Sequence, residues 1–121
     1  MTEIFVFGAN EAGRHGRGAA LAAKLHHGAI YGQGEGLQGQ SYAIPTKDAK
    51  LRPRSLLDIA VSVDTFYAFA LSHPEMTFHL TPVGCGLAGF HAEQIAPMFA
   101  TMPENVILPD VFKTVLETAP T

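Results

Sequence analysis

Two kinds of apolar pattern alternate along this chain, and together they predict strands that alternate with helices. Short, nearly continuous apolar runs are typical of strands buried on both faces. These runs cover residues 3–7, 41–45, 76–82 and 105–108. Apolar residues at helical spacing, clearest from Leu56 to Ala70, predict helices over residues 19–26, 55–72, 91–99 and 109–117. The order β-α-β-α-β-α-β-α predicts an α/β fold with three layers, α/β/α, around a mostly parallel sheet.

Proline and glycine set the expected boundaries of these elements. Pro45 is expected to end the second strand, because proline cannot donate to a sheet ladder. Pro97 is expected to shorten or kink the helix over residues 91–99, unless it lies in the first turn. Residues 28–39 contain five glycines, which argue against a helix there, and no strand is predicted in this segment.

The composition bounds the class of protein. A chain of 121 residues has the length of one domain, and an apolar share of 47% is enough for a core. The charged share of 16% is low, which is compatible with a homo-oligomer interface without requiring one. The lone Cys85 excludes an intramolecular disulfide and fits a reducing compartment. No signal peptide and no bilayer-spanning apolar run is found, so we expect a cytoplasmic protein without a membrane partner.

Charge is distributed unevenly between the two halves. Residues 1–54 carry seven Lys or Arg and four acids, whereas residues 55–121 carry one Lys and seven acids. A net charge of −3 makes general nucleic-acid binding a poor interpretation. The basic first half could face a small anionic ligand, or its charges could simply be solvated.

Two glycine-rich stretches, residues 8–18 and 81–90, each join a predicted strand to a predicted helix. Glycine lets the backbone approach a ligand closely, and the start of a helix offers free N–H groups to an anion. Both stretches leave carboxyl ends of strands, as does the segment 45–48, and parallel α/β sheets bind ligands at that edge. We therefore expect a cleft for a phosphate-bearing ligand. The alternative is that these glycines serve only tight packing.

Other common sites do not fit. Gly13, Gly16 and Gly18 lack the spacing of a dinucleotide fingerprint, and no Gly-Lys-Ser/Thr follows them. The histidines are dispersed, or sequential as at residues 26–27, and do not form a metal set. We expect no metal and no cofactor.

Cys85 and Lys47 each allow a chemical and a structural interpretation. Cys85, between two glycines before a helix, could be an activated thiol, but a small side chain packed under the loop is favoured. Lys47, just after a strand, could contact phosphate or form a Schiff base with an opened sugar. It could also be a solvent-facing loop lysine.

The motifs resemble those of the macro-domain superfamily over about residues 4–108. The resemblance is carried by three stretches of this sequence: Phe7 to Ala20 (F-G-x-N-x-x-G-R-H-G-x-G-A-A), Tyr31 to Lys47 (Y-G-Q-G-E-G-L-Q-G-x-S-Y-A-I-P-T-K) and Gly84 to Phe90, which holds G-C-G-L. The G-C-G-L version is typical of the branch with DNA-ADP-ribose and terminal-ADP-ribose glycohydrolases. Small macro-like proteins of bacteria and phages are similar along the whole chain. The resemblance implies a single macro-like domain over residues 1–121.

The resemblance also implies roles for individual residues. Asn10 and Phe90 would contact the distal ribose. The ribose loop would be lined by Gly13, Arg14, His15, Gly16 and Gly18. Backbone N–H groups for the diphosphate would come from Gly84, Cys85, Gly86, Leu87, Ala88 and Gly89. Lys47 matches the lysine that attacks the ribose in the terminal-ADP-ribose hydrolases.

One departure from that branch bears on function. The hydrolases carry an Asp where this chain has Ala88, so Glu11 or Glu35 would have to supply a carboxylate. The resemblance implies binding of ADP-ribose or a related nucleotide diphosphate, free or on a modified macromolecule, and leaves the base open. A glycohydrolase using Lys47, or a water oriented by Asn10, is the second interpretation. A phage-type or structural interaction protein with a vestigial cleft is the third.

Overall fold

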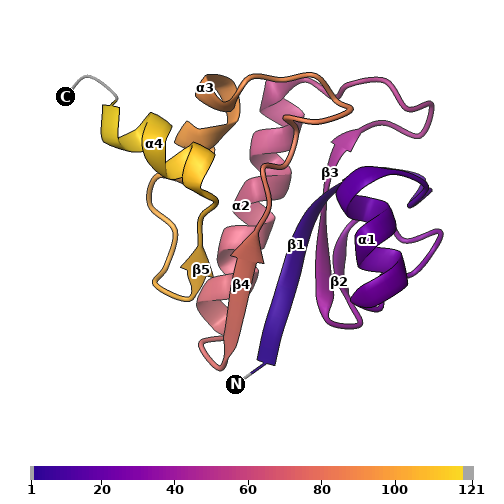
Figure 1. The fold of residues 1–121 in the computed structure, drawn as a ribbon, viewed down its shortest axis with the longest axis horizontal. Helices are drawn as coiled ribbons and strands as arrows, with labels where there is room; N and C mark the ends of the chain where they lie inside the picture. Colours follow the sequence, from indigo (N-terminus) through magenta and orange to yellow (C-terminus); the bar gives the residue numbers. More distant parts are fainter. Residues whose placement is uncertain (1, 119–121) are drawn as a thin grey trace.

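The computed structural model describes residues 2–118, which form a five-stranded sheet with helices on both faces (Figure 1). The strands are β1 (Thr2–Asn10), β2 (Gly36–Gln38), β3 (Ser41–Lys47), β4 (Met76–Leu80) and β5 (Val106–Ile107). The helices are α1 (Gly18–His26), α2 (Leu56–Ser72), α3 (Ala92–Ile95), the 3-10 helix η1 (Ala96–Phe99) and α4 (Asp110–Thr118). The strand order is β2-β3-β1-β4-β5, and β2 alone is antiparallel to its neighbour. The predicted α/β class with a mostly parallel sheet is confirmed.

The two faces of the sheet bury cores of different size. Side chains alternate along a strand, so Ile4 and Val6 of β1 join the larger core, whereas Phe7 and Ala9 join the smaller one. The larger core packs the sheet against α2, α3, η1 and α4. The smaller core packs β1 and β3 against α1, through Ala23. The three layers seen in Figure 1 follow from this division.

The long helix α2 begins where the sequence predicts. The Ser55 hydroxyl accepts the N–H of Asp58 at 3.1 Å, as an N-cap does. The apolar residues at helical spacing then face the larger core, with Ile59, Val63 and Phe66 fully buried. This helix leads from the end of β3 back to the start of β4.

The structure differs from several of the predicted strands. The strand expected over residues 3–7 continues to Asn10, and the strand expected to end at Pro45 continues to Lys47. Proline is tolerated there because the β1–β3 register shifts between Ala9 and Asn10, a local irregularity of the kind that accommodates proline. The glycine-rich segment also contains a short strand, β2, which the sequence does not predict because no alternation of apolar and polar residues marks it.

The α-helix expected over residues 91–99 is shortened, as the position of Pro97 predicts. It consists of one α-helical turn, α3, followed by the 3-10 helix η1. Pro97 lies in the first turn of η1, where its missing N–H costs nothing. No helix within residues 2–118 is long and apolar enough to cross a membrane.

Candidate functional site

A cavity of about 450 Å³ lies at the carboxyl ends of β1, β3 and β4. Its volume is within the roughly 300–1,000 Å³ usual for small-ligand sites. Three segments that are distant in sequence line it: the end of β1 with the start of α1, the end of β3, and the loop after β4. The predicted residues among its lining are Asn10, Arg14, Gly16, Gly18, Lys47, Gly84, Gly86, Leu87 and Ala88. The expected convergence at one sheet edge is therefore present.

The loop after β4 presents backbone N–H groups that have no acceptor. Cys85 donates to the carbonyl of Pro82 at 3.1 Å and Gly89 to that of Gly86 at 3.0 Å. By contrast, among the described residues nothing accepts the N–H groups of Gly84, Gly86, Leu87 and Ala88. These same four residues line the cavity. Unpaired backbone donors need water or a ligand, and a row of them suits an anion.

The loop takes this shape because Gly84 adopts a φ of +80°. The positive φ favours glycine, and a Cβ there would stand 3.2 Å from the Cδ1 of Ile95, a tight contact. Gly86 differs. It has no positive φ, and a Cβ at that position would meet nothing within 4 Å in the described part of the chain. The fold therefore does not require glycine at residue 86, and the space beside it is open.

The start of α1 supplies a second set of unpaired donors. The N-cap residue Arg17 makes no side-chain capping bond, and the first intrahelical bond runs from Leu21 to the Arg17 carbonyl at 3.1 Å. The N–H groups of Gly18, Ala19 and Ala20 consequently have no acceptor within residues 2–118. All three residues line the cavity, so the positive end of a helix borders it.

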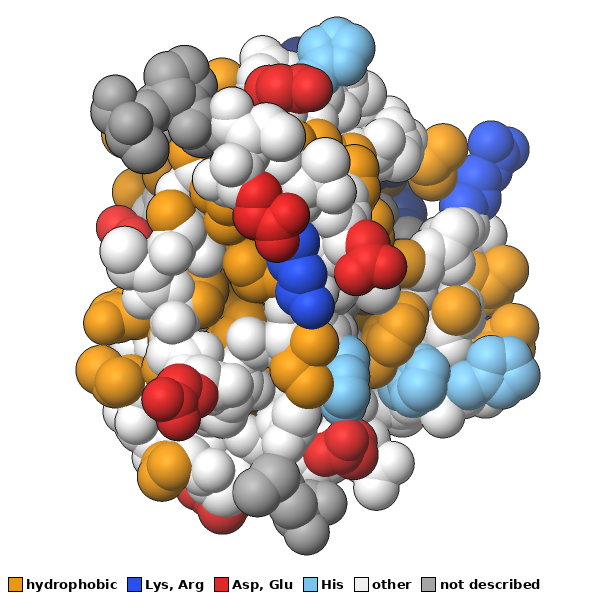
Figure 2. All heavy atoms as spheres, turned by 60° about the vertical axis from the view of Figure 1, so that its left-hand side comes forward, with side chains coloured by type: hydrophobic (Ala, Val, Ile, Leu, Met, Phe, Trp, Pro, Cys, Tyr) orange, Lys and Arg blue, Asp and Glu red, His pale blue; other side chains and the backbone are white. Residues whose placement is uncertain are grey.

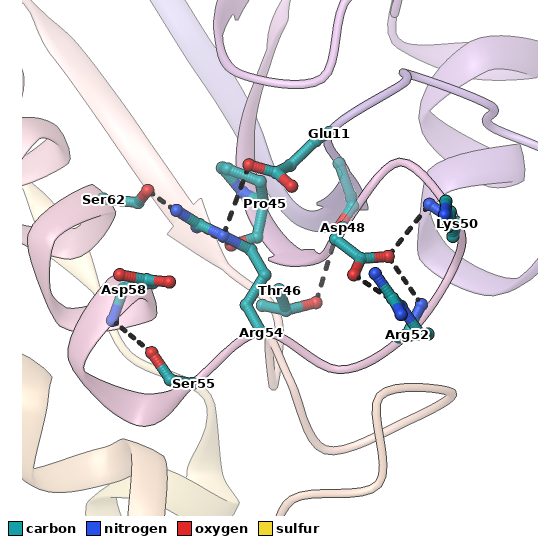
Figure 3. A network of polar contacts seen from close by, with 11 residues as sticks. Glu11, Pro45, Thr46, Asp48, Lys50, Arg52, Arg54, Ser55, Asp58 and Ser62 are labelled. Atoms are coloured by element: carbon teal, nitrogen blue, oxygen red, sulfur yellow. Dashed lines mark hydrogen bonds and ion pairs between the residues drawn. The ribbon is translucent and has the colours of Figure 1, made fainter.

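Charge in the cavity has one sign. Its lining includes Arg14, Arg17 and Lys47, and no Asp or Glu. None of these three cations forms an ion pair within the described residues. The carboxylate of Glu11 turns to Arg54 instead, with Oε2 3.7 Å from Nε, as Figure 3 shows. Glu35 is exposed and does not line the cavity. The cavity thus favours an anion over a cation.

Asn10 is buried and closes the turn that carries Arg14. Its Oδ1 accepts the N–H of Arg14 and its Nδ2 donates to the Arg14 carbonyl, both at 3.0 Å. One N–H of the Asn10 amide is left without an acceptor in residues 2–118. The Asn10 side chain therefore stabilises the turn, and it has one N–H donor left beside the cavity.

Two residues expected in the ribose loop lie away from the cavity. A Cβ on Gly13 would come within 2.3 Å of the backbone nitrogen of Gln33, so this glycine allows two loops to pack backbone to backbone. His15 is fully buried beside Phe7, with Nε2 3.1 Å from Oε1 of Gln38. Because that amide oxygen can only accept, Nε2 carries the proton, and Nδ1 has no partner among the described residues. Both residues support the loop from behind.

Three residues of the second predicted loop also point elsewhere. Phe90 and Cys85 pack against the larger core, and Gly89 is exposed outside the lining. Burial, with the nearby Glu93 carboxylate, raises the pKa of the Cys85 thiol. A raised thiol pKa fits the packing interpretation of this cysteine rather than the activated one. Within residues 2–118 no cluster of three His, Cys, Asp or Glu could hold a metal ion.

Several lining residues were not singled out in the sequence. They are Gly8, Ala9, Arg17, Ala19, Ala20, Thr46, Leu51, Pro82 and Val83. Arg17 stands inside the glycine-rich motif and could have been chosen for its charge alone. No feature of the sequence predicts that Leu51 lies at the cavity, because nothing in the sequence shows how the loop after β3 folds.

Comparison with known proteins gives the fold and no more. No known protein family and no curated protein matches the chain. A solved structure of a Bacteroides thetaiotaomicron protein of unknown function is similar, with a TM-score of 0.58, 17% identity, and coverage of 88% of this chain and 85% of that one. Another crystal structure from the same organism has a TM-score of 0.56, 18% identity, and coverage of 88% of both chains.

Proposed function

We propose that this protein binds ADP-ribose, or a related nucleotide diphosphate, in the cavity at the carboxyl ends of β1, β3 and β4. One observation carries the proposal: two separate sets of unpaired backbone N–H groups, at the start of α1 and in the loop after β4, belong to residues that line a single cavity. Each set suits one phosphate group. Two sets in one cavity suit a diphosphate.

The charges support the same ligand class. Arg14, Arg17 and Lys47 add positive charge without opposing carboxylates in the lining, which favours a ligand with more than one negative charge. The resemblance of the glycine-rich motifs to macro domains narrows the class to ADP-ribose. An ADP-ribosylated macromolecule would present the same group to the cavity.

Calorimetric titration of the protein with ADP-ribose, ADP and AMP tests the proposal. ADP-ribose and ADP are expected to bind and AMP to bind much more weakly, because AMP lacks the second phosphate group. Raising the salt concentration should weaken binding, since exposed charges are screened. Absence of binding by all three ligands would contradict the proposal and favour the interpretation of a vestigial cleft.

A second candidate is hydrolysis of an ADP-ribose linkage, and the position of Lys47 favours it. Lys47 lines the cavity and has no carboxylate partner within the described residues. Its amine would attack the anomeric carbon of the ribose as the bond to the acceptor breaks and the acceptor leaves with a proton, and water would then cleave the lysine adduct and release ADP-ribose. Ala88 lines the same cavity where the similar hydrolases carry an Asp. Neither Glu11 nor Glu35 lines it, so no described carboxylate takes that place.

Single-turnover release of ADP-ribose from modified DNA and modified protein separates binder from hydrolase. We expect slow release by the wild type and faster release by Ala88→Asp, because a positioned carboxylate gives about 10²–10⁴-fold through acid–base catalysis. The variants Glu11→Gln and Glu35→Gln serve as controls. If the wild type releases ADP-ribose quickly, and Glu11→Gln and Glu35→Gln release it equally quickly, the interpretation as a protein that only binds ADP-ribose is contradicted.

A further inference from the structure

The carboxylate of Asp48 accepts three hydrogen bonds within the loop after β3. Oδ1 of Asp48 accepts the N–H groups of Lys50 and Arg52 at 2.9 and 3.0 Å, and Oδ2 accepts Nε of Arg52 at 2.9 Å (Figure 3). Backbone bonds from Asp48 to the Arg52 carbonyl at 2.8 Å and from Leu51 to the Asp48 carbonyl at 3.0 Å close the same turn. Arg52 and Lys50 stand outside the cavity lining. These hydrogen bonds therefore hold the shape of the loop, and Lys50 and Arg52 lie outside the region where a ligand would bind.

The residue at the tip of this turn is held in an unfavourable conformation. Leu51 has a φ of +65°, and among the described residues it is the sole non-glycine residue with a positive φ. A branched aliphatic side chain pays for that conformation, which glycine and asparagine adopt more readily. Such a conformation persists where the surroundings enforce it, and such positions concentrate at ligand sites.

The result of this conformation is an apolar side chain at the cavity. Leu51 lines the same cavity as Lys47 and is still 47% exposed. The groups that would hold phosphate are N–H groups and cations, and these gain nothing from the side chain of Leu51. An exposed leucine gains free energy only when an apolar surface covers it.

We propose that Leu51 is a specificity-determining residue of this cavity, which packs against the apolar nucleoside portion of the ligand, and that Asp48 is the positioning residue that holds it there. The inference rests on the proposed function, because it requires a ligand with a diphosphate and a nucleoside. It adds that the loop after β3 distinguishes such a ligand from a bare diphosphate.

Titration with two probes, ADP-ribose and inorganic pyrophosphate, tests the inference. Leu51→Asn should weaken ADP-ribose binding about five- to tenfold, the value of covering roughly half a leucine side chain. It should change pyrophosphate binding less than about twofold, because pyrophosphate has no apolar surface. Leu51→Gly should behave in the same way and melt no lower than the wild type, since glycine relieves the left-handed conformation. The matched control is Leu57→Asn, because Leu57 is 75% exposed and lies on α2 outside the cavity lining.

A double-mutant cycle tests the role of Asp48. Asp48→Ala should reduce the preference for ADP-ribose over pyrophosphate by a similar factor, and adding Leu51→Asn should reduce it little further. If Asp48 has a purely structural role, Asp48→Ala should weaken the binding of ADP-ribose and of pyrophosphate by the same factor. That result would refute the positioning role.

The outcomes separate this inference from the proposed function. If the wild type binds both probes equally well, or if Leu51→Asn weakens both by the same factor, the inference is refuted while the diphosphate site stands. Unchanged ADP-ribose binding by the Leu51 variants refutes it as well. If the wild type binds neither probe, the proposed function fails, and this inference fails with it.

Discussion

The side chain of Asn10 and the backbone of Arg14 form a reciprocal pair of hydrogen bonds, each 3.0 Å long. The pair joins the end of β1 to the loop that carries two cavity cations, Arg14 and Arg17. Asn10 is buried, so leaving the N–H and carbonyl of Arg14 without their hydrogen-bond partners would lower the stability of the fold. The Asn10 amide therefore helps to fix the geometry of the cationic side of the cavity, together with the packing of Gly13 and His15 behind the loop.

Replacing that amide should affect stability and binding together. Asn10→Ala removes both bonds, so we expect a loss of about 1–3 kcal/mol in the free energy of unfolding and weaker ADP-ribose binding. Chemical denaturation and calorimetry measure the two effects. Gln40→Ala is the control, because the Gln40 side chain is exposed and none of the described hydrogen bonds uses it, and its effect should stay within about 0.5 kcal/mol. Wild-type stability of Asn10→Ala would contradict this role.

Two glycines of the loop after β4 should respond differently to valine. At Gly86 a Cβ would meet no described atom within 4 Å, so Gly86→Val should fold and melt like the wild type. It should no longer bind ADP-ribose, because the valine side chain would take the space of the phosphate. At Gly84 the φ of +80° and the 3.2 Å approach to Ile95 should cost about 1–3 kcal/mol of stability. Thermal melting and titration of both variants check this. If Gly86→Val stays folded and binds as well as the wild type, the diphosphate assignment is wrong.

Lys47 should matter for the ligand and not for the fold. No ion pair within residues 2–118 uses its amine, so Lys47→Ala should change the free energy of unfolding by less than about 0.5 kcal/mol. Loss of a charged donor to phosphate should weaken ADP-ribose binding about 10- to 100-fold. Lys50→Ala is the matched control, because Lys50 is exposed and outside the cavity lining. A large loss of stability with unchanged binding would place Lys47 in a structural role.

Cys85 should behave as a protected thiol. Burial and the Glu93 carboxylate hold its pKa above the ordinary value of 9.0, so the protonated form dominates at pH 7 and the reactive thiolate appears only as the pH rises past that value. Alkylation by iodoacetamide should therefore be slow at pH 7 and accelerate steeply above pH 9. The chain has one cysteine, so the rate reports this site alone. Rapid alkylation at pH 7 would restore the activated-thiol interpretation.

The sequence predicted the layers and the sheet edge of the site because both follow from short-range patterns. Buried parallel strands such as residues 4–7 are recognisable as continuous apolar runs, and the carboxyl ends of parallel strands must share one edge. Glycine-rich turns at that edge then pointed to loops that line the cavity in the structure.

The errors have physical causes that act over longer distances. The strand β2 pairs with β3 through only three residues and lies within a glycine-rich segment, so no local pattern reveals it. Gly13 and His15 share a motif with Arg14, yet packing against the backbone of residue 33 and the side chain of Gln38 directs them away from the cavity. The position of Leu51 depends on hydrogen bonds of Asp48 that only the folded loop forms.

Titration of the backbone amides with ADP-ribose, followed by two-dimensional nitrogen–proton NMR, measures most directly whether the two sets of N–H groups bind the diphosphate. The largest shifts are predicted at the unpaired amides of the two sets, Gly84, Gly86, Leu87 and Ala88 in one loop and Gly18, Ala19 and Ala20 at the start of α1. Amides of α4, such as those of Lys113 and Thr114, should stay unchanged because they lie outside the cavity lining. Binding of ADP-ribose that leaves the amide signals of both sets unchanged would show that neither set holds the diphosphate.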